Sequence, residues 1–344
     1  MSAVAPASLT DPWTLGSLRV PNRVLLAPLA GIGNWFVRLQ AKRYGAGMAV
    51  SEMVSSHAIH HGNAKTCNEM LRIDPAEREH GPVSIQLFGE DPAIMRSAAA
   101  HVAALGADAI DINMGCPVPK VQKTGAGAAL LGDPDRAVAV ARAAVEGAGG
   151  LGGIPVTVKL RSGLRAGDES GFAVAHRLVE EAGVAAIAFH PRSAAVHHKG
   201  TPDYALAARL VASLPAPVIL TGGLADAAHV RTVFVETGAS AVMLARGALG
   251  NPWLFAELVG ARERPPSPDE VMRELDWTID RAVEHLGEER AGRYLRKFYP
   301  WYVARLQLEA PLARRLAESL QSTAGVGAAR EILGHSQELL PASR

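Results

Sequence analysis

Residues 109–117 read AIDINMGCP. They form a mainly apolar run that ends in a turn, and other apolar runs ending in turns occur along most of the chain. The stretch begins as an apolar run, Ala109–Met114, and ends in a turn that contains Gly115 and Pro117. Strands of a parallel sheet are covered by helices on both faces, so they tend to be apolar along their whole length. The stretch is therefore typical of a buried parallel strand followed by a loop.

Eight runs of this kind occur before residue 246. They are Val24–Leu29, Met48–Met53, Val83–Phe88, Ala109–Met114, Val156–Leu160, Ala186–His190, Val218–Thr221 and Ala241–Ala245. Between them lie stretches with helical character, several of which follow an Asp suited to an N-cap. These are Pro92–Leu105, Pro134–Glu146, Gly171–Ala182, Asp203–Leu214 and Asp226–Thr237. The alternation predicts an α/β fold, a (β/α)8 TIM barrel, with an open doubly wound sheet as the alternative.

The pattern changes after residue 261. Arg262–Pro268 contains three prolines and is typical of a linker, and strand signals stop beyond it. The remaining segments with helical character are Glu270–Leu286, Arg290–Glu309, Leu312–Leu320 and Gly327–Leu333. The sequence thus predicts a catalytic barrel domain over residues 1–261 and a small all-helical C-terminal domain over residues 262–344.

Composition limits the class of protein. Of 344 residues, 48% are hydrophobic and 20% are charged, which suits a globular protein with a large core. The formal net charge of +1 gives no overall attraction to a polyanion, so a nucleic-acid surface would have to be local. The two cysteines, Cys67 and Cys116, form no disulfide framework. Met1–Thr10 has no secretory pattern and no run is long enough for a membrane span, so we expect a cytoplasmic protein.

Polar residues gather at or near the ends of the apolar runs. They are Glu52, Gln86, Asp111, Asn113, Cys116, Lys159, His190, Thr221 and Arg246. A single polar residue in a strand is usually a core group with a partner, and each unpaired one would cost about 1–3 kcal/mol. Barrel enzymes bind their ligands at the carboxyl ends of the strands. So many polar residues at that end therefore predict one polar ligand.

Glycines end the seventh and eighth runs, as Gly222-Gly223 and as Gly247 after Arg246. In barrels these two loops commonly hold a phosphate, because backbone N–H groups and a helix N-terminus point at it. Arg246 would add a charge-assisted hydrogen bond. A tight turn explains Gly222-Gly223 equally well, and a flavin phosphate, a nucleotide and a sugar phosphate all remain open.

Lys159 and Cys116 have residue types that indicate chemistry. A lysine within a strand is rare unless it is paired, and it suits either the negative charge of a reduced flavin or a Schiff base. Cys116 lies just past a strand end, where a thiol can act as an acid, or as a nucleophile if its pKa is lowered. A buried structural role is the alternative, and it fits Cys67 better.

Taken in order, these motifs resemble the tRNA-dihydrouridine synthase family, in particular its bacterial B-type branch. The resemblance runs from about Leu18 to Tyr302. It rests on Ala27–Gly31, Ser51–Met53, Ile85–Leu87, Asp111–Pro117, Lys120–Leu131, Lys159–Arg161, His190, Arg246–Ala248 and Asn251–Trp253. The most specific part is the cysteine motif together with the downstream Lys123–Gly127.

The resemblance implies that FMN binds in the barrel, that NADPH reduces it, and that the substrate is a uridine in tRNA. It further implies hydride transfer to C6, protonation of C5 by Cys116, and a helical RNA-binding domain, with no obligate protein partner. The residues that it assigns to the flavin ring or ribityl chain are Pro28, Leu29, Ala30, Gln86, Lys159 and His190. Those assigned to the phosphate side are Thr221, Gly222, Gly223, Ala245 and Arg246, and those assigned to the RNA are Asn113, Arg296 and Lys297.

The chain departs from the family pattern at three positions. Gly223 stands where the family often has Asp, and Asn34 stands where Asp is usual. Phe298 replaces the histidine that commonly follows the basic pair. A backbone contact to phosphate survives the first change, whereas a contact from the missing carboxylate does not.

A local basic segment supports RNA binding. Between Arg290 and Arg315 there are seven Lys or Arg residues and one acidic residue, Glu309. The aromatic residues among them are Tyr294, Phe298, Tyr299, Trp301 and Tyr302. Cations and aromatics on one helix suit phosphate contacts and base stacking, although the aromatics would also suit packing on the barrel.

Two other functions remain as alternatives. A reductase of free pyrimidines, similar to dihydroorotate dehydrogenases, would not need the basic helical domain. A non-catalytic RNA-binding protein would not need Cys116, Lys159 and His190.

Overall fold

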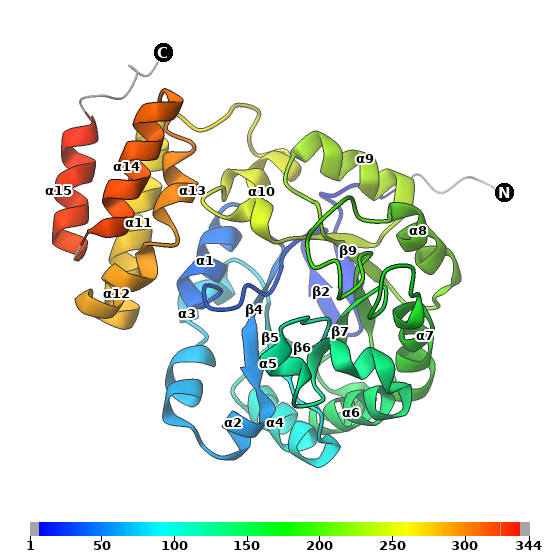
Figure 1. Ribbon diagram of the computed structural model, residues 1–344. Coiled ribbons are helices and arrows are strands. Elements are labelled where there is room, and N and C mark those ends of the chain that lie inside the picture. The colour runs from blue at the N-terminus through cyan, green and yellow to red at the C-terminus, as the bar shows by residue number, and fades with distance from the viewer. Residues whose placement is uncertain (1–6, 324, 338–344) are drawn as a thin grey trace.

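A closed barrel of eight parallel strands forms the centre of the molecule. The computed structural model describes residues 7–323 and 325–337. The strands are β3 (Val24–Leu26), β4 (Met48–Ser55), β5 (Val83–Phe88), β6 (Ala109–Met114), β7 (Val156–Arg161), β8 (Ala186–His190), β9 (Val218–Thr221) and β10 (Ala241–Leu244). They pair in chain order, and β10 closes the ring against β3 (Figure 1). The barrel predicted from the apolar runs is confirmed, and the open sheet is excluded.

Helices surround the strands. The longer ones are α1 (Trp35–Arg43), α4 (Pro92–Ala104), α6 (Pro134–Gly147), α7 (Ser170–Ala182), α8 (Tyr204–Ser213), α9 (Ala227–Thr237) and α10 (Trp253–Leu258). Short turns are α2 (Ser56–His60), α3 (Pro75–Glu79), α5 (Pro119–Gln122), a π-helix at Thr66–Met70, and 3-10 turns at Gly127–Gly132, Gly150–Gly152 and Arg246–Ala248. The predicted Asp N-caps are present, as where Asp91 accepts a hydrogen bond from the Ile94 N–H at 3.0 Å.

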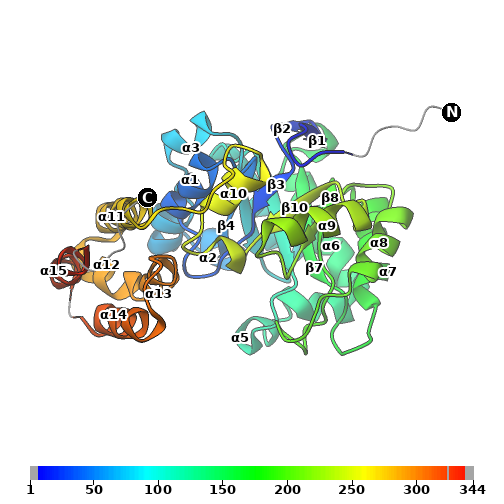
Figure 2. The same cartoon turned by 90° about the horizontal axis from the view of Figure 1, so that it is seen from above.

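A hairpin closes the amino-terminal end of the barrel. It consists of β1 (Trp13–Leu15) and β2 (Leu18–Val20), which the apolar pattern did not predict because each strand has only three residues. Its side chains join a core cluster with Leu25, Met48 and small alanines from the strand starts. The hairpin and α5 lie on opposite sides of the barrel, so the end near α5 is the open one (Figure 2).

The C-terminal region is helical, as predicted. It contains α11 (Pro268–Leu286), α12 (Glu288–Leu295), α13 (Tyr299–Val303), α14 (Ala310–Ser322) and α15 (Val326–Gln337). The prediction of one helix over Arg290–Glu309 was wrong. The chain bends after Leu295 and restarts with Pro300 in the first turn of α13, since proline is not tolerated in a helix interior. The domain boundary between residues 261 and 262 stays a prediction. The last residues of the predicted C-terminal domain, 338–344, lie outside the described chain.

The helical region lies beside α1 and shares its core (Figure 1). Gln40 on α1 places its amide nitrogen 2.8 Å from Glu274 Oε1 and 2.8 Å from Tyr302 Oη. The Thr278 hydroxyl joins the same buried group at 2.9 Å from Tyr302 Oη. Barrel and helical region are therefore joined through polar as well as apolar contacts.

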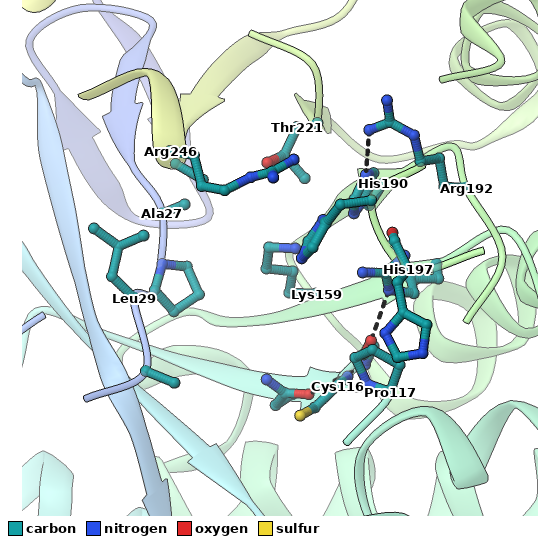
Figure 3. A pocket seen from close by; sticks show the side chains of 18 of the residues that line it. Ala27, Leu29, Cys116, Pro117, Lys159, His190, Arg192, His197, Thr221 and Arg246 are labelled. Carbon is teal, nitrogen blue, oxygen red and sulfur yellow. Dashed lines mark hydrogen bonds between the residues drawn. The ribbon is translucent and has the colours of Figure 1, made fainter. Parts of the chain in front are cut away.

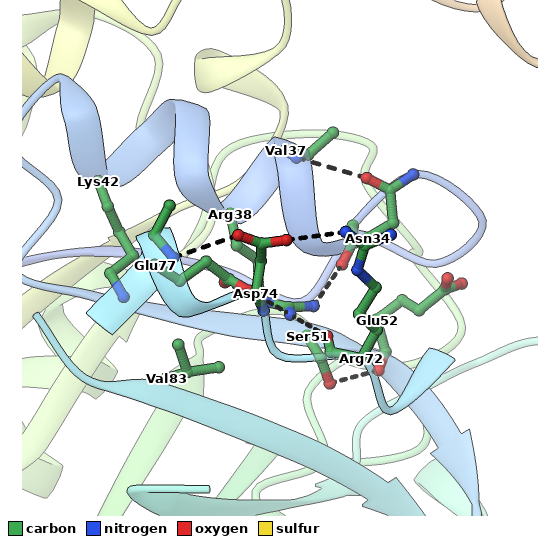
Figure 4. Close-up of polar contacts among 12 residues, drawn as sticks. Asn34, Val37, Arg38, Lys42, Ser51, Glu52, Arg72, Asp74, Glu77 and Val83 are labelled. Atoms are coloured by element: carbon green, nitrogen blue, oxygen red, sulfur yellow. Dashed lines mark hydrogen bonds and ion pairs between the residues drawn. The ribbon is translucent and has the colours of Figure 1, made fainter. Parts of the chain in front are cut away.

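A buried ion pair fixes α1 against α3. Arg38 donates from Nε to Glu77 Oε1 at 2.8 Å and from Nη2 to Glu77 Oε2 at 2.9 Å (Figure 4). Both side chains are fully buried, and Arg38 also donates to the Arg72 carbonyl at 2.7 Å. This pair anchors the helix that directly follows the loop between β3 and α1.

None of the helices in the described residues is both long and apolar enough to cross a membrane. The expectation that Met1–Thr10 is no secretory signal falls partly on residues 1–6, which lie outside the described chain.

Candidate active site

A cavity of about 670 Å³ opens at the carboxyl end of the barrel strands (Figure 3). Its lining includes thirteen of the residues that the sequence singled out. They are Pro28, Leu29, Ala30, Gln86, Asn113, Cys116, Lys159, His190, Thr221, Gly222, Gly223, Ala245 and Arg246. Arg296 and Lys297 lie elsewhere, and so do Glu52 and Asp111, the two acidic residues near strand ends. The size is in the range of about 300–1,000 Å³ that is usual for cofactor and small-ligand sites.

The charged residues of the cavity all have the same sign. Lys159, Arg161, Arg192 and Arg246 line it, and no Asp or Glu is among its described lining residues. Figure 3 shows Lys159 near the middle of the pocket, with Arg246 and Cys116 on different sides of it. A concave site lined by cations alone favours an anionic ligand.

Two glycines shape the phosphate side of the cavity. Gly222 and Gly223 have φ values of +103° and +78°, a region that favours glycine. A Cβ atom at Gly222 would lie 2.3 Å from His190 Cδ2, and one at Gly223 would lie 2.5 Å from Tyr204 Oη. The space that a side chain at position 223 would need is filled by Tyr204 and Pro202. In this chain, Tyr204 and Pro202 therefore leave no room at position 223 for the Asp side chain that the family often has there.

Lys159 on β7 and His190 on β8 line the cavity from neighbouring strands. Burial and, to a smaller extent, nearby Arg161 lower the pKa of Lys159 to about 8, while Asp111 opposes the change. Burial and the cations Lys159 and Arg161 hold the pKa of His190 well below its ordinary value. His190 Nε2 lies 3.3 Å from Arg192 Nη1, which can only donate, so the imidazole proton belongs on Nδ1.

The loop of Cys116 is held from the end of β6. Asn113 Oδ1 accepts the Cys116 N–H at 2.9 Å and the Gly115 N–H at 3.2 Å. The Gly115 carbonyl in turn accepts a hydrogen bond from Arg161 Nε at 2.9 Å. The thiol is half-buried at the rim of the cavity.

A buried polar chain lies beneath this loop. Asn113 Nδ2 donates to Gln86 Oε1 at 2.9 Å, and Gln86 Nε2 donates to Asp111 Oδ2 at 2.6 Å. Thr157 Oγ1 donates to the other carboxylate oxygen at 2.5 Å. Burial raises the pKa of Asp111 to about 6, and these two donors oppose that rise. An ionised Asp111 can only accept, so it sets the orientation of both amides and, through them, of the Cys116 loop.

Several cavity residues received no role from the sequence, and Arg161 was noted only as part of the motif Lys159–Arg161. Arg161 donates to the carbonyls of Ser193 at 3.1 Å and His197 at 2.7 Å, and His197 has φ +52°. Arg192, His197 and His198 come from the loop after β8 and also line the cavity. These residues could have been predicted from the sequence, because several cations and histidines follow each other in that loop, directly after the end of a strand.

Of the three residues predicted to contact RNA, Asn113 lines this cavity, whereas Arg296 and Lys297 lie outside it. Lys297 Nζ donates to the Gly31 carbonyl at 3.2 Å and lines a second cavity of about 390 Å³ with Lys65, Arg290 and Arg293. Arg296 donates to the Thr323 carbonyl at 2.9 Å.

Three of the five aromatic residues of the basic segment cannot stack on bases, because Phe298, Tyr299 and Tyr302 are buried in the core. For these three the packing alternative was right. Tyr294 and Trp301 are also packed against the core, although they are only partly buried.

Fold and site together define a barrel enzyme with a cationic cavity at the carboxyl end of its strands. Among solved structures, the chain is similar to morphinone reductase in complex with tetrahydroNAD, with a TM-score of 0.55 and 18% identity over 77% of this chain and 94% of that one. It is also similar to a variant of NCR from Zymomonas mobilis, with a TM-score of 0.54 and 19% identity over 74% and 92%. At such identities the likeness establishes the fold alone.

The family follows from sequence comparison. A family model described as dihydrouridine synthase (Dus) matches residues 25–335. The chain is 36% identical to tRNA-dihydrouridine synthase B of Xanthomonas campestris pv. campestris over 84% of its length and 86% of that protein. It is also 36% identical to a probable tRNA-dihydrouridine synthase of Rhodobacter capsulatus over 90% and 93%. The chain belongs to the dihydrouridine synthase family, and it is therefore an oxidoreductase that reduces uridine to dihydrouridine.

Proposed function

We propose that this enzyme reduces uridines in tRNA with FMN as its flavin and NADPH as the reductant. The observation that carries the proposal is the cavity whose charged lining residues, among those that the structure describes, are all cations, with a free thiol among its lining groups. The tRNA substrate is supported by the names of the relatives in Xanthomonas and Rhodobacter. A nicotinamide reductant is supported by the tetrahydroNAD complex of the similar barrel.

The residues of the cavity fit FMN. The ring would lie against Pro28–Ala30 and near Lys159, whose ammonium group suits negative charge on a reduced flavin. The phosphate would lie by Gly222, Gly223 and Arg246, where backbone N–H groups and a guanidinium are available. No carboxylate is among the described residues that line the cavity, so none of them repels this dianion at close range.

The chemistry then divides between cofactor and protein. When bound and reduced, FMN would supply the hydride that adds to C6 of the uracil. Cys116 gives its thiol proton to C5, so that the S–H bond breaks, a C5–H bond forms, and water later reprotonates the thiolate. Asn113 holds the Cys116 backbone through Oδ1. Its Nδ2 donates to Gln86 and makes a weak contact with Met53 Sδ at 3.8 Å, and the N–H of that weak contact would turn to a uracil carbonyl. Acid catalysis of this kind contributes about 10²–10⁴ in rate.

The substrate must leave its base stack to reach this cavity, so the enzyme accepts a flipped nucleotide. The second cavity carries Lys65, Arg290, Arg293 and Lys297 beside the barrel, together with Glu52 and Glu69. Arg290 is paired with Glu69 and Arg293 with Glu289, so RNA phosphates would compete with these carboxylates for the two guanidinium groups. We place the enzyme in the cytoplasm and assign it no obligate protein partner. We also propose that the barrel domain spans residues 1–261 and the RNA-binding domain residues 262–344.

The test has two arms. The purified protein should show a bound flavin spectrum, and dihydrouridine should disappear from the tRNA of cells that lack the gene. Bound flavin with unchanged tRNA would instead favour a reductase of free pyrimidines. A protein that takes up no flavin would overturn the proposal.

The variant Cys116→Ala tests the acid. We expect it to bind FMN as the wild type does and to lose at least about 10²-fold in the rate of uridine reduction, since only the proton donor is removed. Single-turnover reduction of a tRNA transcript measures the rate, and Cys67→Ala serves as the matched control. Full activity of Cys116→Ala would remove this residue from the mechanism.

A further inference from the structure

One wall of the main cavity is the loop between β3 and α1. Pro28, Leu29, Ala30 and Ile32 line the cavity from this loop. The turn is tight: Gly31 has φ +73°, and a Cβ atom at Gly33 would lie only 3.0 Å from the Leu29 carbonyl oxygen. The position of this wall depends on what holds the loop from behind.

The helical region holds it. Tyr294 Oη donates to the Ile32 carbonyl at 2.8 Å and accepts from Asn34 Nδ2 at 2.9 Å. Lys297 Nζ donates to the Gly31 carbonyl at 3.2 Å. From the barrel side, Glu52 accepts the Gly31 N–H at 2.8 Å. Two successive residues of the loop, Gly31 and Ile32, together with Asn34, therefore have contacts that fix the wall, and two of the side chains involved come from more than 250 residues away in the chain.

Packing keeps Tyr294 in place independently of its hydroxyl group. Its ring lies edge-on to Phe36 at 6.0 Å and tilted against Phe298 at 4.9 Å between ring centroids. The Lys297 ammonium lies 5.7 Å from the centre of the same ring. Replacing Tyr294 by Phe should therefore remove the two hydrogen bonds and leave the ring where it is.

We propose that Tyr294 and Lys297 are positioning residues that hold the Pro28–Asn34 wall, so that the helical region sets the affinity of the barrel for its cofactor. The inference rests on the proposed function, because it takes this wall as part of the FMN site. It gives Lys297, expected from the sequence to contact RNA, a role that does not need RNA.

The experiment measures FMN affinity of the full chain by quenching of flavin fluorescence, without tRNA or NADPH. We expect Tyr294→Phe and Lys297→Met each to weaken FMN binding roughly three- to tenfold, the range for the loss of one or two hydrogen bonds. The unfolding temperature of the flavin-free Tyr294→Phe protein should stay close to that of the wild type.

Two buried tyrosines of the same region provide matched controls. Tyr302→Phe removes a hydroxyl that bonds Gln40 and Thr278, and Tyr299→Phe removes one that has no hydrogen-bond partner among the described residues. Neither touches the loop, so both should keep wild-type FMN affinity even if Tyr302→Phe lowers the unfolding temperature.

The outcomes separate the two proposals. If the wild type binds FMN and both Tyr294→Phe and Lys297→Met bind it as tightly as the controls, the positioning role is wrong and the proposed function stands. If the wild type binds no FMN, both proposals fall. If Tyr294→Phe does not fold, Lys297→Met alone decides, since its exposed side chain makes a single bond to the loop.

Discussion

Lys159 carries its positive charge into a cavity where none of the described lining residues is negative. Burial lowers its pKa to about 8, from 10.5 in an unfolded chain. Its charge therefore costs stability in the flavin-free protein below pH 8, and this cost disappears as the pH rises from 8 to 10.5. Burial alone favours the neutral form of Lys159. A bound anionic ligand favours the charged form instead, because it binds that form more tightly.

This linkage predicts a pH-dependent cofactor affinity. We expect FMN binding to weaken as the pH rises from 7 to 9, because the free protein loses the Lys159 proton that the complex retains. Lys159→Met should bind FMN more weakly at pH 7 and show little change over the same interval. Fluorescence titrations at pH 7, 8 and 9 measure this, and an equal slope for both proteins would contradict the assignment.

The buried chain below Cys116 leads to a second prediction at this scale. Gln86→Met breaks the link between Asp111 and Asn113, whereas Thr157→Val removes the other donor to Asp111 and leaves that link intact. We expect the first variant to change the alkylation rate of Cys116 by about tenfold and the second by much less. Iodoacetamide labelling of flavin-free protein measures the rate, so that any contact of Gln86 with the flavin does not enter. Equal rates in the two variants would mean that Asp111 does not position the loop.

At the scale of elements, the turn after β9 depends on glycine for two reasons. Gly222→Ala meets an unfavourable φ of +103° and also places a Cβ atom 2.3 Å from the His190 ring. Gly200→Ala also meets a positive φ, of +65°, which lies in the left-handed helical region and in open space. We expect the control to lose about 1 kcal/mol and Gly222→Ala to lose about 2–4 kcal/mol, with weaker FMN binding as His190 moves. Urea unfolding compares the two, and equal losses would mean that His190 gives way freely.

The elements that the sequence predicted are those whose residues are buried in a regular pattern. Ala109–Met114 and Ala186–His190 begin and end where the apolar runs do, because helices cover both faces of these strands. The hairpin Trp13–Val20 has too few residues for any periodicity to be visible. The break before Tyr299 could have been predicted from Pro300, but the aromatic residues around it suggested a continuous helix.

The site was predictable to the extent that it depends on strand ends. Cys116, Lys159 and His190 follow or end apolar runs, so their meeting follows from the barrel itself. Arg192 and Tyr294 could not be placed in this way. Arg192 reaches the cavity from an irregular loop. Tyr294 contacts the cavity wall from a helix that packs on α1, and no local sequence pattern predicts such a long-range contact.

At the scale of the whole molecule, barrel and helical region share one core. Apolar residues from both belong to a single cluster, and Gln40 joins them through a buried polar group with Glu274 and Tyr302. We therefore expect one cooperative unfolding transition. Circular dichroism and the release of bound flavin should follow the same urea curve. Two separate transitions would instead mean that the helical region unfolds on its own.

The distribution of charge has a kinetic consequence. The protein as a whole has a formal net charge of only +1, so a distant anion feels almost no attraction. Within about 8 Å, the screening length at physiological ionic strength, the cations of the cavity dominate. Cofactor uptake should therefore be guided only over its last few ångströms. Added salt should slow the association rate modestly, far less than in enzymes that attract their ligands over long distances.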